Sequence, residues 1–384
     1  MTDTSRSAHA PVCRSAHARG EHWADITRQC LAALGKVEAG ALGFVYVTDH
    51  LAPHLPAIVD QLRLTTGLEN WIGTIGIGVL GEDNEGGIAE YYDEPAMSLM
   101  VLPVPADSFR LLDPNPGGGS SRLRAISDWM AAKKPSVGLV HGNPTNGHLP
   151  ALMRQLSGTA GLFLLGGFTS SRQGYLQVAG DTGEAALSGA LLTDEVALVT
   201  GLSQGCVPIG PQHIVTEAED EIVKEIDGRP ALEVFREEIG EVLARDLNRV
   251  GGFIFAALPV AGSDTGDYLV RNITGIDTQR QWLAIGAEIA AGQPILFAKR
   301  DKASAKADFG RMLKRLKSRI DRPIKGGLYV SCVARGPNLF GQDAAETRMI
   351  AEHLGEFPLT GFFANGEISH DRFYAYTGVL TLFL

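Results

Sequence analysis

Three stretches of this sequence follow one order: an apolar strand, a polar turn, an amphipathic helix, and a second strand rich in glycine. The first strands are predicted at residues 41–47, 136–140 and 327–331, from their length and apolar, β-branched content. Glycines lie at the ends of the three second strands: Gly73, Gly76, Gly78, Gly166, Gly167, Gly361 and Gly366. Recurrence of one supersecondary unit predicts a fold made of pseudo-equivalent modules.

The strand glycines have two interpretations. Glycine inside a strand costs packing and conformational entropy, so it usually marks a bulge or a close approach of another backbone. Tight twisting where strands cross is the alternative. In either case, the turns that follow such strands are natural places to hold a small ligand.

Further strands follow in each unit, including 88–92, 184–192 and 373–384. The pattern therefore predicts an α+β protein with mixed, largely antiparallel sheets flanked by helices, built from repeated β-α-β-β units. A length of 384 residues exceeds what one core usually supports, so we expect two domains. They are predicted over 21–235, with a Pro- and Gly-rich linker near 103–121, and over 236–384.

The first twenty residues differ from the rest of the chain. Arg-Ser-Ala-His-Ala occurs at residues 6–10 and again at 14–18, without apolar periodicity. A secretory signal is not expected, because the stretch has no hydrophobic h-region, and its Arg and Ser content resembles a transit peptide only superficially. We expect residues 1–20 to be a disordered tail.

Composition excludes several classes of protein. A net charge of −10 disfavours binding to nucleic-acid backbones, and no apolar run approaches the roughly 20 residues that a membrane helix needs. The four cysteines lie far apart, with neither metal-ligand spacing nor the density of a disulfide framework: Cys13, Cys30, Cys206 and Cys332. We therefore expect a cytoplasmic protein without metal or cofactor.

Two sequence motifs suggest catalysis or nucleotide binding. Gly76–Gly81 satisfies G-x-G-x-x-G, but an acidic turn follows it instead of the helix that a dinucleotide site needs. The segment around Ser203 matches G-x-S-x-G, although Pro208 and Pro211 oppose the helix that a nucleophile elbow launches. Ser203 is therefore a weak hydrolase candidate.

Cys332 and the basic helix at 303–319 each allow two interpretations. Cys332 follows a strand near Arg335, whose charge would favour a reactive thiolate, or it is a small buried hydrophobe. The helix is a solvated face, or it docks an acidic partner. A thiol-dependent enzyme and an interaction scaffold are thus alternatives to ligand binding.

Arg335 and Glu367 occupy the two turns of the third unit, on predicted strand ends that would be neighbours. Arginine offers a planar fork to a carboxylate, and a carboxylate can receive an ammonium group. Together they would bind the two charged ends of an amino acid; equally, they would pair with each other. Nearby turn residues complete the predicted ligand site: Gly336, Asn365, Gly366, His141, Asn143, Thr169 and Ser170.

Several motifs, in order, resemble landmarks of the FIST family: Gly205-Cys-Val-Pro-Ile-Gly210, Ile226-Asp-Gly-Arg-Pro-Ala231, Asp267-Tyr-Leu-Val-Arg-Asn272, Cys332-Val-Ala-Arg-Gly336 and Gly361-Phe-Phe-Ala-Asn-Gly-Glu-Ile368. The resemblance covers roughly residues 42–384, as an N-terminal and a C-terminal FIST region. It implies a small-ligand sensor of bacterial signalling, with amino acids as proposed ligands, and it supplies no catalytic residues to carry over to this chain. Since no output module follows in the sequence, we expect signalling through a separate protein or through homo-oligomerisation.

Overall fold

The computed structural model describes residues 13–37, 40–105, 107–114, 119–158, 160–244, 246–247, 250–260 and 266–384. Helix accounts for 27% of the chain and strand for 41%, in mixed and antiparallel sheets, which confirms the predicted α+β class. Two compact units are present. One comprises Met1–Leu202, Met312–Arg372 and Gly378–Leu384, and the other comprises Ser203–Arg311 and Phe373–Thr377. Among the described residues, no helix has the length and apolar character to cross a membrane.

The first unit contains the three predicted modules, apart from residues 373–377 of the third. Module 1 is β2 (Leu42–Thr48), the 3₁₀ helix η1 (Asp49–His54), α2 (Leu55–Thr66), β3 (Trp71–Gly76), β4 (Gly78–Glu82), β5 (Ile88–Tyr92) and β6 (Ala96–Leu102). Module 2 is β8 (Val137–Gly142), α4 (Leu149–Gly158), β9 (Phe163–Phe168), β10 (Gln177–Ala179), β11 (Asp181–Gly183) and β12 (Leu187–Leu192). Module 3 is β21 (Gly326–Cys332), α7 (Gly336–Leu339), α8 (Ala345–Leu354), β22 (Leu359–Ala364), β23 (Glu367–Ser369), β24 (Arg372–Tyr374) and β25 (Thr377–Phe383).

Three six-stranded sheets share one strand order. Each has a parallel central pair (β2 and β3, β8 and β9, or β21 and β22), with the last strand of the same module antiparallel to the first. The far edge of each sheet is a hairpin from a different module: β10–β11 beside β3, β23–β24 beside β9, and β4–β5 beside β22. The other edge is β1 (Arg14–Arg19), β7 (Phe109–Leu112) or β13 (Leu198–Gln204). The modules therefore exchange hairpins cyclically, and the repeat predicted from sequence is confirmed.

Glycine occupies one equivalent position in the three second strands. Gly73, Gly166 and Gly361 pair with the central residue of the first strand of their own module. A Cβ atom on these glycines would lie 1.7, 1.8 and 1.8 Å from the facing carbonyl oxygen. Because no side chain fits at that distance, the structure confirms a close approach of two backbones as the reason for glycine.

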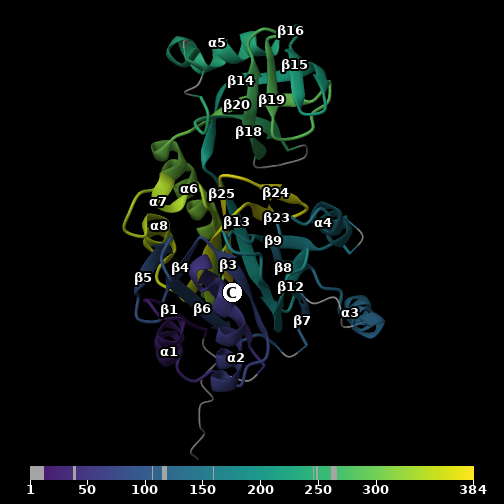
Figure 1. Cartoon of the computed structure of the whole chain (residues 1–384). Coiled ribbons are helices and arrows are strands. Elements are labelled where there is room, and N and C mark those ends of the chain that lie inside the picture. The colour runs from purple at the N-terminus through teal and green to yellow at the C-terminus, as the bar shows by residue number, and fades with distance from the viewer. Residues whose placement is uncertain are drawn as a thin grey trace, which may run out of the picture. The chain divides into compact units, whose positions relative to one another are not determined.

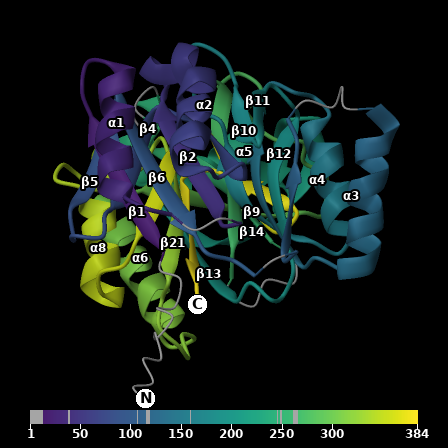
Figure 2. The ribbon, with the colours of Figure 1, turned by 90° about the horizontal axis from the view of Figure 1, so that it is seen from below.

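The inner faces of the three sheets contribute to a common core. Phe44 and Tyr46 from β2, Leu139 from β8, and Val330 and Phe362 from module 3 are fully buried in it. Helices cover the outer faces: α1 (Trp23–Leu34) and α2 pack on the first sheet, as Figure 2 shows, and α4 packs on the second. Burial from both sides explains why the central strands are mainly apolar.

Helix α2 shows how local sequence positions these layers. Its apolar stripe, Leu55, Ile58, Val59 and Leu62, is buried. This spacing places one face of the helix on the sheet. A proline in the first turn and Gly67 in the left-handed conformation mark the two ends, and the Gly67 amide donates to the Arg63 carbonyl at 2.8 Å.

Some segments differ from the sequence predictions. Arg14–Arg19, inside the expected disordered tail, forms β1 and pairs with β6, because Ala16 and Ala18 are buried against the apolar residues beneath α1. Phe109–Leu112, inside the predicted linker, forms β7 and pairs with β12. The linker is also shortened at its end by α3, which spans Gly119–Lys133. The third module, predicted in a C-terminal domain, lies in the same unit as the other two.

The second unit is a seven-stranded antiparallel sheet with a helix packed on it. Its strand order is β14 (Cys206–Glu219), β20 (Pro294–Arg300), β17 (Ile254–Pro259), β18 (Tyr268–Asp277), β19 (Trp282–Ile285), β15 (Ile222–Ile226) and β16 (Arg229–Pro230). Helix α5 (Ala231–Ala244) buries Phe235 against Phe297. The domain boundary predicted near 235–240 falls inside α5, and α6 (Lys302–Lys317) leads back to the first unit (Figure 1).

Candidate functional site

The ends of the three second strands meet and hydrogen-bond to one another. The Ser170 amide donates to the Ile75 carbonyl at 3.1 Å, and the Ser170 hydroxyl donates to the Phe363 carbonyl. The Asn365 amide donates to the Phe168 carbonyl at 3.0 Å. The structure therefore brings together the turns that the sequence analysis selected from different modules.

Most of the residues predicted for the ligand site are buried at this junction. Thr169 is fully buried, with its hydroxyl 2.6 Å from that of Thr74, and Ser170 is 4% exposed. Gly366 is buried as well, and its carbonyl accepts a hydrogen bond from the Phe168 amide at 2.8 Å. Asn365 is exposed. It is the residue of this group that a dissolved molecule reaches first.

Arg335 is held by a buried carboxylate that the sequence analysis missed. Its Nε and Nη2 lie 2.9 and 2.8 Å from Oε1 of Glu346, and both side chains are fully buried. The same carboxylate accepts hydrogen bonds from the Tyr329 hydroxyl, the Ser331 hydroxyl and the Gly336 amide, at 2.6, 3.0 and 2.7 Å. Burial alone would lower the pKa of Arg335, but the charge and hydrogen bonds of Glu346, together with Tyr329 and Glu367, keep that pKa above its usual range.

Glu367 lies on β23, fully buried, close enough to Arg335 to contribute to that raised pKa. The two charges predicted to be neighbours are therefore near each other. Gly336 takes the left-handed conformation (φ +48°), and a Cβ there would lie 2.5 Å from the Phe363 ring. This dense packing fixes the turn between β21 and α7. Within it, Arg335 already has a structural partner, Glu346. Its role toward a ligand stays a prediction.

His141 and Asn143 end strand β8 in different surroundings. His141 is in the common core, with Nε2 3.0 Å from the Tyr46 hydroxyl and its ring beside Phe362. Burial lowers its pKa to about 3, so the imidazole is neutral. Asn143 accepts two hydrogen bonds from Thr145 at 2.9 and 2.8 Å, which shapes the following turn. Neither side chain is on the exposed surface.

The two weak catalytic candidates are buried. Ser203 is within β13, and its hydroxyl donates to Asp308 Oδ2 at 3.1 Å, as does the Gln204 amide at 2.8 Å. Strand β14 starts at Cys206, where a nucleophile elbow would start a helix. Cys332 is 5% exposed, at the end of β21. These positions supply no accessible nucleophile at the surface.

Two further acids have raised pKa values: Glu90 is half-buried beside the first turn of α8, and Glu82 is buried near the segment that follows this helix. Oε1 of Glu90, on β5, accepts from the Thr347 amide and hydroxyl at 2.9 and 3.1 Å, in the first turn of the helix. Burial, together with the charge of Glu346, raises the pKa of Glu90 to about 7. Glu82, at the end of β4, is fully buried, and burial and the nearby Glu356 raise its pKa to about 7.

Glu82→Gln is expected to stabilise the protein at pH 8 and to leave its stability unchanged below about pH 4. The pKa of Glu82 is higher in the folded protein than in the unfolded chain. Stability therefore falls as the pH rises from the unfolded pKa to the folded pKa, and a neutral amide avoids this loss. The gain at pH 8 should be on the order of 1–3 kcal/mol. Urea unfolding at pH 4, 6 and 8 measures it. Glu85→Gln, on the exposed turn nearby, is the control; an equal gain there would refute the assignment.

Comparison with known proteins places this arrangement in a wider group. Residues 41–229 match the model of the FIST N domain, and residues 231–370 match that of the FIST C domain. An uncharacterised protein of Mycobacterium tuberculosis is 34% identical over 197 residues, covering 48% of this chain and 51% of the relative. An uncharacterised protein of Mycobacterium bovis is 32% identical over 194 residues, covering 48% and 50%. The chain thus spans about half the length of these curated relatives.

Proposed function

Because the chain belongs to the FIST family, whose domains are small-ligand sensors in signal transduction, we propose that it binds an amino acid or a related small carboxylate. The observation that supports a site is the junction of the three second strands. There, exposed Asn365 lies two residues from buried Glu367, and Glu367 lies near Arg335. A carboxylate and an ammonium group would each find an opposite charge at this place.

In this proposal, ligand binding requires movement of the segment from α7 to α8. Arg335 and Glu346 are both fully buried, so a ligand reaches the guanidinium only when α8 is displaced. The ligand carboxylate then takes the place of Glu346, and Asn365 contacts the exposed end of the ligand. A ligand that binds the displaced arrangement better shifts the population toward it. That shift is the signal.

The output of the sensor is also a proposal. We infer that a separate signalling protein, or a second copy of this chain, detects the displaced arrangement, and that this occurs in the cytoplasm. The net charge of −10 argues against nucleic acid as the partner.

A thermal-unfolding screen of amino acids and small carboxylates tests the proposal. A ligand at about 100 times its Kd should add roughly 2.7 kcal/mol of stability and raise the melting temperature. Asn365→Ala and Glu367→Gln should reduce that rise, whereas exposed Gln342→Ala should not. Failure of the whole panel to raise the melting temperature would overturn the function. A rise that both site variants retain would instead show that the ligand binds elsewhere.

A further inference from the structure

The end of α6 and the segment that follows it concentrate positive charge in the first unit. Residues 312–325 contain six basic side chains and one acidic side chain, whereas the chain as a whole has a net charge of −10. Four of the basic side chains are exposed within two helical turns, and we call them the basic surface: Lys314, Arg315, Lys317 and Arg319. The remainder of the chain is therefore more acidic than its net charge indicates.

The basic surface is the outer face of one helical segment. Three apolar residues of α6 are buried on the opposite face: Met312, Leu313 and Leu316. Beyond the end of α6, the Arg319 amide still donates to the Leu316 carbonyl at 3.0 Å, so the chain continues to turn. At about 1.5 Å of rise per residue, the four cations span less than about 8 Å along the helix axis.

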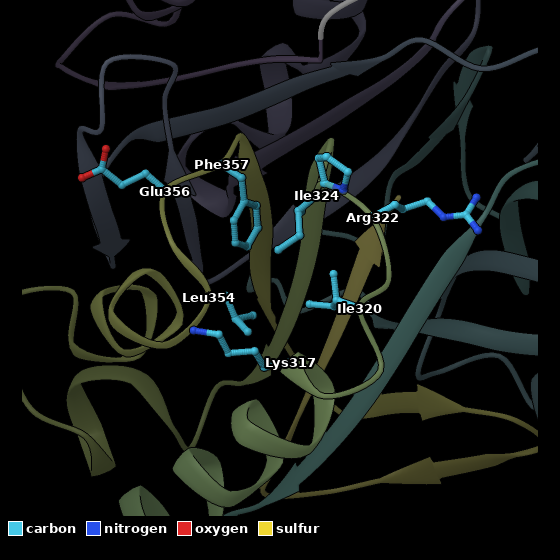
Figure 3. A pocket seen from close by; sticks show the side chains of 8 residues that line it. Lys317, Ile320, Arg322, Ile324, Leu354, Glu356 and Phe357 are labelled. Carbon is cyan, nitrogen blue, oxygen red and sulfur yellow. The ribbon is translucent and has the colours of Figure 1, made fainter.

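Figure 3 shows the charged ends of Lys317 and, three residues beyond the basic surface, Arg322. Each is directed away from the apolar side chains of Ile320 and Ile324, which lie between them. The apolar residues after α6 therefore pack inward while the neighbouring cations extend toward solvent.

Neighbouring carboxylates do not neutralise the basic surface. Lys317 and Arg319 donate to the carbonyls of His353 and Thr200, at 2.7 and 3.0 Å. Lys314 and Arg315 form no ion pair with any residue that the structure describes. A cation near a helix C-terminus complements the helix dipole, but further cations three and four residues apart repel one another. A merely solvated helix face usually carries charges of both signs.

The extent and sign of the basic surface select the class of partner. Alternate residues of an extended chain lie roughly 6.5 Å apart, so two carboxylates of an acidic segment fit within it. The guanidinium groups of Arg315 and Arg319 suit carboxylates, which they bind with two donors. A nucleic acid or an anionic membrane extends further, and repulsion from the acidic remainder of the chain acts over a Debye length of about 8 Å.

We propose that the basic surface binds an acidic segment of a separate signalling protein. Carboxylates of that segment lie on Lys314, Arg315 and Arg319. The Lys317 ammonium binds the carbonyl of His353, near the end of α8, so the surface is joined to the helix whose displacement is the proposed signal. The inference rests on the proposed output through a separate protein, and it concerns residues outside the small-ligand site.

The probe is octaglutamate with blocked ends, titrated into the full chain in a calorimeter at low salt. It should bind with saturation, and a neutral octapeptide of alternating glutamine and serine should not. The double variant Lys314→Gln with Arg315→Gln should weaken binding by roughly tenfold or more, and raising the salt to about 500 mM should do the same. Both variant side chains are exposed, so the melting temperature should stay at the wild-type value.

The matched control is Lys133→Gln with Lys134→Gln, which removes the same charge at the end of α3. Binding of octaglutamate should stay within about twofold of the wild-type value, because only local charges act through salt. Equal losses in the two double variants would show that net charge, and not the basic surface, attracts the peptide.

Three other outcomes would overturn the assignment. The first is absence of octaglutamate binding at low salt. The second is tighter binding, through Lys314 and Arg315, of a single-stranded DNA dodecamer or of phosphatidylserine vesicles. The third is a dimer of the full chain that the Lys314→Gln, Arg315→Gln variant no longer forms in sedimentation. None of these measurements uses a small ligand, so the thermal screen separately decides whether the ligand-binding proposal stands.

Discussion

Glu346→Gln is expected to destabilise the protein by about 3–5 kcal/mol, because it removes the charge of the carboxylate that the buried Arg335 guanidinium pairs with. The amide also presents donors where the carboxylate accepted from Tyr329, Ser331 and Gly336. Urea unfolding at pH 7 measures the loss.

The control for this prediction is Glu352→Gln, an exposed position on the same helix. It should change the free energy of unfolding by less than about 0.5 kcal/mol. If the two variants lose equal stability, the buried pair is not what fixes α8. Arg335→Met combined with Glu346→Gln should recover part of the loss, since the uncompensated charge is gone.

Gly361→Ala is expected to abolish folding or to cost more than about 4 kcal/mol. The added Cβ would lie 1.8 Å from the Tyr329 carbonyl oxygen, and both groups belong to the paired backbones of β21 and β22. Neither backbone can move without breaking its ladder. Soluble yield and urea unfolding provide the measurement.

Equivalent substitutions extend the test. Gly73→Ala and Gly166→Ala should have similar effects, because their Cβ atoms would meet carbonyl oxygens at 1.7 and 1.8 Å. Gly147→Ala, in an exposed turn with nothing within 4 Å, should fold normally. Wild-type stability in Gly361→Ala would show that the close approach is not required.

Local patterns predicted the modules because each strand and helix has its own periodicity. The strand at Ile88–Tyr92 was predicted with the bounds that the structure has. The exchange of hairpins was not predicted. Which strand pairs with β4 depends on a partner, β22, that lies far along the chain, and no local pattern encodes that choice.

Proline explains another difference. Pro208 and Pro211 led us to reject a helix after Ser203, and the structure agrees, but the long strand β14 was missed. Pro211 is tolerated because the pairing with β20 is interrupted between Ile209 and His213. Such an interruption of strand pairing depends on the partner strand, so the sequence of β14 alone does not predict it.

Site residues were predictable where they follow strands. Arg335 and Glu367 stood out as charges in turns, and the structure places them near each other. Glu346 did not, because an amphipathic pattern does not tell which acidic residue of a helix faces inward. The acids on β5 and at the end of β4 were missed because their surroundings are formed by segments far along the chain: α8 for Glu90, and the residues after α8 for Glu82.

The hairpin exchange makes the sequence boundary between the two FIST regions different from a folding boundary. The N domain match ends at residue 229, yet β4 pairs with β22 and β9 pairs with β23, both in the C domain match. A fragment ending at 229 would leave two sheets with unpaired edges, and such edges invite aggregation. The two matched regions therefore contribute strands to the same sheets, and α8 is joined to β5, 257 residues earlier in the chain, by the hydrogen bond from the Thr347 amide to Glu90.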